Sequence, residues 1–159
     1  MNSRIVICTG LLQILKHQVL EQTKDGLKYY TGEVMTNNPP FISQWRECQE
    51  ENEYIGCDIQ YNNYFKSRGM NTIGLNGDYT SMGRFQRVVW LKNKLEETDN
   101  DFNNVSQGFH LLASVEQLYG ATPVKGRFEY TIYSVVYDME NMNCYLKRYD
   151  ECILEKVLV

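Results

Sequence analysis

The sequence has no long apolar run and no cluster of basic residues. Its longest apolar stretch, residues 5–15, is interrupted by Thr9, Gly10 and Gln13 and is too short to span a bilayer. Sixteen basic residues against twenty acidic ones give a net charge of −4, and no nucleic-acid-binding motif is present. We therefore expect neither a membrane nor a nucleic acid as a partner.

Cysteine and histidine pairs at metal-binding spacing are also absent. The five cysteines form no Cys-x-x-Cys pair, and none stands near either histidine at a zinc-ligand spacing. An odd number of unpaired cysteines favours reduced thiols in a cytoplasmic protein over a disulfide framework. We expect no metal site and no cofactor. The cysteines are Cys8, Cys48, Cys57, Cys144 and Cys152.

What the chain does contain is typical of one globular domain rich in β-sheet. It has 159 residues, of which 43% are hydrophobic and 13% aromatic, with twelve tyrosines. Residues 16–22 and 27–36 are predicted strands, joined by a tight turn at Asp25-Gly26. Pro39 and Pro40 end the sheet, a short helix is expected at 42–51, and residues 52–78 are expected to form a loop.

Two main helices and a strand meander follow. Asp78, Thr80 and Ser81 are candidate N-caps of a helix that runs on from Met82. A second helix is expected from a cap at Asn104 or Ser106 to Gly120, and strands are expected at 127–139, 144–150 and 152–159. The pattern predicts an α+β fold with an antiparallel sheet.

Five stretches resemble the choloylglycine hydrolase family, which includes bile salt hydrolases and penicillin V acylases. They occur in the family's order from about residue 19 to the end of the chain, and five collinear matches are more specific than one. They are VLEQTKDGLKYY (19–30), VMTNNPPF (34–41), GLNGDYTSMGRFQRVVWL (74–91), NVSQGFHLLASVEQ (104–117) and FEYTIYSVVYDMEN (128–141).

The resemblance implies part of an N-terminal-nucleophile hydrolase with an α/β/β/α sandwich. Members cleave amide bonds that are not peptide bonds, by means of an N-terminal cysteine whose own α-amine acts as base. Their length is about twice that of this chain. We therefore expect residues 1–159 to be a single, incomplete domain of this type, a truncated C-terminal portion that acts on conjugated bile salts, penicillin V or similar N-acyl amides.

The resemblance also implies two site residues. Asn37, in the Thr-Asn-Asn motif, is at the position of the family's oxyanion-stabilising asparagine, and Arg84 is at the position of its active-site arginine. A carboxamide can donate to an oxyanion, and a guanidinium can lower the pKa of a thiol. The alternative interpretations are that Asn37 only forms a turn before the prolines and that Arg84 is a solvated charge.

Two departures stand near Arg84. The family's usual proline is Asn76 here, and the serine that usually precedes the arginine is Gly83. These changes indicate either drift under weak selection or a distant branch of the family.

Cys8 is the candidate nucleophile, because Cys8-Thr9-Gly10-Leu11 matches the family's N-terminal motif. Thr36 follows it by only 28 positions, whereas a long segment lies between these motifs in the family, and seven residues would have to be removed to free its amine. The other interpretation, a small apolar side chain within a strand, is favoured.

Two functions from different classes remain in competition. One is an amide hydrolase with a small-molecule N-acyl amide as substrate. The alternative is a non-catalytic half-domain that associates with itself or with a complementing N-terminal half, because half of a sandwich leaves apolar surface uncovered.

Overall fold

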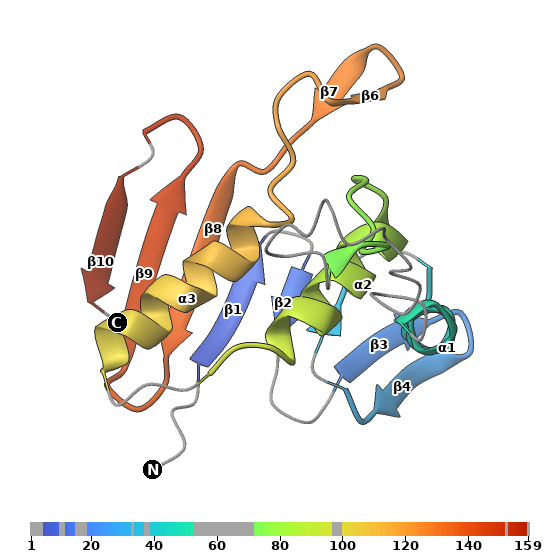
Figure 1. Ribbon diagram of the computed structural model, residues 1–159, viewed down its shortest axis with the longest axis horizontal. Helices are drawn as coiled ribbons and strands as arrows, with labels where there is room; N and C mark the ends of the chain where they lie inside the picture. Colours follow the sequence, from blue (N-terminus) through green and yellow to red (C-terminus); the bar gives the residue numbers. More distant parts are fainter. Residues whose placement is uncertain are drawn as a thin grey trace, which may run out of the picture.

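A computed structural model describes the chain in eight segments (Figure 1): residues 5–9, 12–14, 19–32, 34–36, 39–52, 72–96, 100–151 and 153–158. Its largest element is a six-stranded antiparallel sheet with the order β10-β9-β8-β1-β2-β5. The strands of this sheet are β1 (Ile5–Thr9), β2 (Leu12–Ile14), β5 (Val34–Met35), β8 (Tyr133–Asp138), β9 (Asn143–Arg148) and β10 (Leu154–Leu158).

The first described strand lies in the middle of this sheet. In β1, Ile5 is paired with Asp138 of β8 and Thr9 with Ser134, and the other edge of β1 pairs with β2. The predicted C-terminal meander is confirmed as β8, β9 and β10. The two ends of the described chain are thus joined through one continuous ladder.

The described residues form three helices: α1 (Phe41–Asn52), α2 (Ser81–Lys92) and α3 (Asp101–Ala113). Figure 1 shows α3 crossing over β8 and β1. Helix α2 contacts β5 and α3, and α1 packs against α2. The core between the layers is formed by apolar side chains that are almost completely buried. Its most deeply buried members include Phe41, Phe85, Val88, Leu112 and Val136.

A separate hairpin, β3 (Val19–Thr23) and β4 (Gly26–Tyr30), confirms the predicted tight turn. Gly26 supplies a positive φ of 106°, which glycine adopts at little cost. The backbone N–H of Phe41 donates to the carboxylate of Glu21 at 3.1 Å, so β3 caps the start of α1. The hairpin is therefore fixed to the helix by one carboxylate.

Three of the predicted boundaries are wrong. The predicted strand 27–36 is divided between β4 and β5, which belong to different sheets, and Gly32 lies between them with its backbone against the Phe41 ring. The second main helix begins at Asp101, so Asn104 and Ser106 are not its caps, and it ends at Ala113 rather than Gly120. Gly120, with a φ of 90°, instead belongs to a later turn.

The third wrong boundary concerns residues 127–139, which form two strands. The first, β7 (Arg127–Glu129), pairs with β6 (Thr122–Val124) in a hairpin that projects from the body of the molecule (Figure 1). At the break, the N–H of Thr131 donates to the carbonyl of Gln117 and the hydroxyl of Thr131 accepts from the N–H of Gln117. These bonds hold the chain to the segment after α3 and interrupt the ladder.

The predicted α+β class with an antiparallel sheet agrees with these elements. Of the predicted loop 52–78, residues 53–71 lie outside the described part of the chain. No helix among the described residues is long and apolar enough to cross a membrane.

Candidate functional site

The entry to α2 is built by short polar side chains. Thr80 is the N-cap, and its hydroxyl oxygen accepts from the N–H of Gly83 at 3.0 Å. Asp78 in turn accepts from the N–H and the hydroxyl of Thr80, at 2.8 and 2.7 Å. The bond from the Thr80 hydroxyl is the main reason that the pKa of Asp78 lies below its ordinary value, although desolvation opposes it. The first turn of α2 is therefore held in one conformation.

Arg87 fixes this entry to the rest of the fold. Its guanidinium is buried and donates to three backbone carbonyls: Ser114 at 2.7 Å, Asn76, and Asp78 at 3.2 Å. One side chain thus joins the loop before α2 to the turn that follows α3. Because a guanidinium presents five donors in a fixed plane, it suits this bridging position.

Arg84 lies one turn before Arg87 and is also buried, with only 5% of its surface exposed. Its Nη2 donates to the hydroxyl of Ser81 at 3.3 Å. Burial lowers the pKa of Arg84 from its ordinary value and the charge of Arg87 lowers it further, while Glu129 of β7 raises it. An arginine remains charged under these conditions, so the structure holds a positive charge inside the protein at this point.

A second network connects the Thr-Asn-Asn motif to the same helix. The N–H of Thr36 donates to Gln44 Oε1 at 3.2 Å, and Gln44 Nε2 donates back to the Thr36 carbonyl at 3.2 Å and to the carbonyl of Pro39. The Thr36 hydroxyl, which has one proton, lies 2.8 Å from Gln44 Oε1 and 3.1 Å from the carbonyl of Ser81. Thr36 and Gln44 are both buried.

Ser81 is therefore shared between the two predicted site segments. Its carbonyl accepts from Thr36, the residue before Asn37, and its hydroxyl accepts from Arg84. The structure thereby brings the start of the Thr-Asn-Asn motif to the first turn of the helix that carries Arg84. Asn37 itself lies outside the described residues.

Cys8 is described only by its backbone, in β1. Its Cα is paired with Val135 of β8 and with Gln13 of β2, in the interior of the sheet. This agrees with a strand position for Cys8 and leaves its predicted role as nucleophile untested.

Sequence reasoning missed two residues that organise the site, Gln44 and Arg87. Both are long polar side chains within otherwise apolar helix faces, and such a residue needs buried partners. The sequence offered one signal for a structural role of Arg87: together with Arg84, it lies on the same side of α2 as Phe85 and Val88, the side that is buried. The partners of Arg87 could not be inferred, because they are backbone carbonyls of distant segments.

A hollow in the described part of the chain lies elsewhere. It is lined by Thr31, Gly32, Val34, Trp45, Val89, Lys92 and Asn93, and includes none of the predicted site residues. Within the same described residues, no group of three or more His, Cys, Asp or Glu side chains is placed to hold a metal ion.

Comparison with known proteins links this site to one group. The family model described as linear amide C-N hydrolases, choloylglycine hydrolase family, matches residues 15–159. This range contains Asn37 and Arg84 and excludes Cys8. A bile salt hydrolase/transferase from Lactiplantibacillus plantarum is 36% identical over 148 residues, covering 87% of this chain and 46% of that protein. One from Clostridium perfringens is 30% identical, covering 85% and 44%.

Solved structures agree with these sequence matches. A mutant conjugated bile acid hydrolase from Clostridium perfringens superposes with a TM-score of 0.73 at 26% identity, over 89% of this chain and 46% of that one. Penicillin V acylase from Agrobacterium tumefaciens shares the fold, with a TM-score of 0.72 at 18% identity. The chain spans about half the length of the curated relatives that it matches.

Proposed function

Since this chain belongs to the choloylglycine hydrolase family of linear amide C-N hydrolases, we propose that it supplies Asn37 and Arg84 to a site that hydrolyses N-acyl amides. The substrate class that we propose is conjugated bile salts, because two relatives at 30% identity or more are named as bile salt hydrolase/transferases. Penicillin V is the second substrate to test, because a penicillin V acylase shares the fold.

The proposed chemistry proceeds through an acyl-enzyme. The N-terminal cysteine gives its thiol proton to its own α-amine, and the thiolate attacks the amide carbonyl to form the oxyanion. The C–N bond then breaks as the protonated α-amine returns that proton to the leaving amine. Water then hydrolyses the thioester and regenerates the thiol. The carboxamide N–H of Asn37 stabilises the oxyanion, and loss of such a donor costs about 3 kcal/mol of barrier. The charge of Arg84 favours the thiolate over the thiol.

The observation that carries this proposal is the bridge at Ser81. Burial of an arginine costs free energy unless its charge is used in function or compensated by partners. Arg84 is buried and donates to Ser81, which also accepts from Thr36. This arrangement holds Thr36, the residue before Asn37, and Arg84 at one end of α2. It supports the catalytic interpretation of Asn37 and Arg84 over a turn former and a solvated charge.

The nucleophile, in this proposal, is not Cys8. Freeing the amine of Cys8 would remove Ile5, Val6 and Ile7, which are paired with Asp138, Tyr137 and Val136 in the centre of the sheet. Cys8 also lies outside the range that the family model matches. We propose that the cysteine comes from the half of the family's length that this chain does not match.

The test is complementation. The chain is mixed with the N-terminal half of the Lactiplantibacillus plantarum relative, and release of glycine or taurine from conjugated bile salts is measured, with penicillin V in parallel. We expect activity in the mixture that falls at least a hundredfold with Arg84→Ala or Asn37→Ala and persists with Cys8→Ala. Arg46→Ala, at an exposed position on α1, is the matched control.

Two results would contradict the proposal. If neither Arg84→Ala nor the control Arg46→Ala changed the hydrolysis rate of the mixture, Arg84 would have no role in the site. If Cys8→Ala alone abolished hydrolysis, Cys8 would be the nucleophile after all.

As a second candidate function, the chain is a non-catalytic half-domain that binds a partner. Partly exposed side chains on one face of the sheet support this function. Tyr137, Cys144 and Val157 are paired across β8, β9 and β10 and therefore share a face, on which Tyr137 and Val157 are 36% and 42% exposed. We call these three residues the open sheet face. If the N-terminal half bound the chain without any hydrolysis, and Tyr137→Ser with Val157→Ser abolished that binding, this function would replace the first.

A further inference from the structure

Gln44 is a buried polar side chain in an apolar setting. It is 0% exposed and lies on the same face of α1 as Phe41 and Cys48, which are buried too. A buried carboxamide destabilises a protein unless its N–H groups and its oxygen find partners. A leucine or a methionine would fill this position without that requirement, so the glutamine needs a structural reason.

The hydrogen bonds of Gln44 lie at both ends of the Asn37-Asn38 pair. Its Oε1 accepts from the N–H of Thr36 at 3.2 Å, and its Nε2 donates to the Thr36 carbonyl at 3.2 Å and to the carbonyl of Pro39. Thr36 immediately precedes the pair in the sequence, and Pro39 immediately follows it. One carboxamide therefore fixes the chain on both sides of the proposed oxyanion donor, and it uses both of its donors and its acceptor to do so.

Thr36 extends these bonds to α2. Its hydroxyl lies 2.8 Å from Gln44 Oε1 and 3.1 Å from the carbonyl of Ser81, and the hydroxyl of Ser81 accepts from Arg84 at 3.3 Å. Thr36, Gln44 and Arg84 are almost completely buried, so water competes little for these bonds. We call Gln44, Thr36, Ser81 and Arg84 the buried network. It joins α1, the residue after β5 and the first turn of α2.

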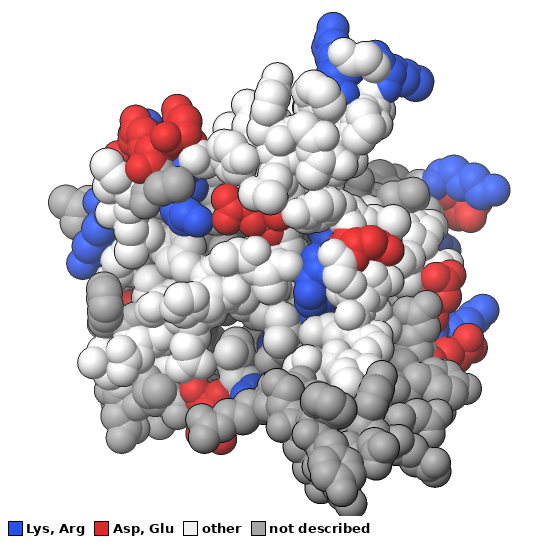
Figure 2. Space-filling view, turned by 45° about the horizontal axis from the view of Figure 1, so that its top comes forward, with Lys and Arg blue, Asp and Glu red and all other residues white. Residues whose placement is uncertain are grey.

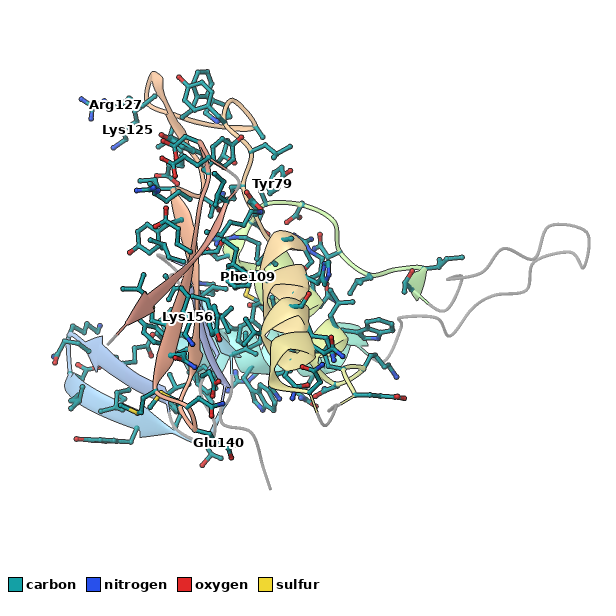
Figure 3. The ribbon with its side chains drawn as sticks, turned by 90° about the vertical axis from the view of Figure 1, so that its left-hand side faces the viewer. Tyr79, Phe109, Lys125, Arg127, Glu140 and Lys156 are labelled. Atoms are coloured by element: carbon teal, nitrogen blue, oxygen red, sulfur yellow. The ribbon has the colours of Figure 1, made fainter. Side chains whose placement is uncertain are left out.

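The basic side chains of the β6–β7 hairpin differ from Arg84 in this respect. Basic atoms gather at the tip of that hairpin (Figure 2). Figure 3 shows that Lys125 and Arg127 of the hairpin point away from the body of the molecule. Both are exposed, so solvent and salt screen their charges, whereas the charge of Arg84 is buried. The effect of Arg84 on a site at the Thr-Asn-Asn motif therefore depends on how the buried network places it.

We propose that Gln44 is a positioning residue for the amide hydrolysis proposed above, and this inference rests on that function. Gln44 holds the backbone on both sides of Asn37, so that the oxyanion donor is preorganised before the reaction begins. Through Thr36 and Ser81, it also fixes that segment relative to Arg84. Because the donor acts on charge that develops only in the reaction, loss of this order lowers kcat and leaves KM almost unchanged.

The test uses the mixture of the full chain with the N-terminal half of the Lactiplantibacillus plantarum relative, with that half at saturating concentration. Gln44→Met removes the hydrogen bonds to the motif. We expect kcat for conjugated bile salts to fall at least about tenfold while KM changes by less than about twofold. Gln49→Met, at an exposed position on the same helix, is the matched control and should keep both values. Circular dichroism shows whether each variant is folded at the assay temperature.

A second pair of variants keeps the test decisive if Gln44→Met does not fold. Thr36→Val keeps the shape of the side chain and the backbone bonds to Gln44, but it removes the hydroxyl that reaches Ser81. We expect kcat to fall about threefold or more, and Thr36→Ser, which restores the hydroxyl, to return kcat to within about twofold of the wild type. A purely structural role would change the stability of the chain without this difference between kcat and KM.

The outcomes separate this inference from the function on which it rests. A wild-type mixture that does not hydrolyse, or one that keeps its activity with Asn37→Ala, would overturn both. A mixture that needs Asn37 but keeps the wild-type kcat with folded Gln44→Met, or with Thr36→Val where Gln44→Met is unfolded, would overturn the role of Gln44 alone. A rise in KM at unchanged kcat would also overturn it, because Gln44 would then act in substrate binding or in docking of the two halves.

Discussion

Gly83 occupies a position on α2 where no side chain fits. An ideal Cβ built there would overlap Asp78 Oδ1 and lie 2.9 Å from Asn76 Oδ1. Asn76 and Gly83 are the two departures from the family pattern near Arg84, and the structure places them in contact. Because the glycine leaves space beside the Asn76 carboxamide as well as beside Asp78, we predict that these two departures compensate each other.

Replacing this glycine should therefore destabilise the protein. Gly83→Ala gains helix propensity but forces the Asp78 carboxylate away from Thr80, and we expect a net loss of about 1–2 kcal/mol in the free energy of unfolding. Urea titration measures it. Gly77→Ala is the matched control, because a Cβ at Gly77 meets no atom within 4 Å.

The compensation itself can be tested in an Asn76→Pro background, which restores the residue usual in the family. In that background, the loss of unfolding free energy caused by Gly83→Ser should be smaller by about 0.5 kcal/mol or more, because Asn76 Oδ1, one of the two oxygen atoms that crowd position 83, is absent. Equal costs in both backgrounds would mean that the two positions are independent.

Gln44 is a second residue whose role is set by its buried partners. Gln44→Met keeps the volume of the side chain but leaves the N–H of Thr36 without its acceptor, so we expect a loss of about 2–4 kcal/mol. Gln49→Met, at an exposed position on the same helix, should change the unfolding free energy by less than about 0.5 kcal/mol. A similar loss in both variants would show that the network to Thr36 contributes nothing specific.

At the scale of elements, α2 was predictable because its signals are local. Thr80 is one of the three proposed caps, and Phe85, Val88 and Val89, which recur at helical spacing in the sequence, are buried on one face. The end of α3 was not predictable in this way. The carbonyl of Ser114 accepts from Arg87 Nε instead of continuing the helix towards Gly120, and a bond across 27 positions leaves no trace in a helical pattern.

The entry to α2 should also respond to acid. The folded-state pKa of Asp78 is lower than its ordinary value, so its ionised form stabilises the folded protein above the ordinary pKa of about 3.9. That contribution is lost as the pH falls through the lower folded-state pKa. Urea unfolding between about pH 2 and pH 6 should therefore show an advantage of the wild type over Asp78→Ala that shrinks at the acid end. A constant difference across this range would contradict the assignment.

At the scale of the whole molecule, the predicted family and the predicted N-terminal-nucleophile hydrolase fold are confirmed. The candidate site was predictable only as separate motifs. Arg84 could be identified from its sequence block, but its burial and its link to Thr36 through Ser81 depend on how α2 packs against β5 and the residue that follows it. Hydrophobic periodicity predicts which face of a helix is buried, but it does not predict which other element packs against that face.

The position of β1 also determines how the molecule can assemble. Of the described strands it is the first to be synthesised, yet its partner β8 begins only at Tyr133, so the ladder from Ile5 to Asp138 closes a loop of most of the chain. Such distant pairing slows folding and leaves strand edges open to other chains in the meantime. The middle of the sheet is therefore completed near the end of synthesis, although it contains the earliest strand.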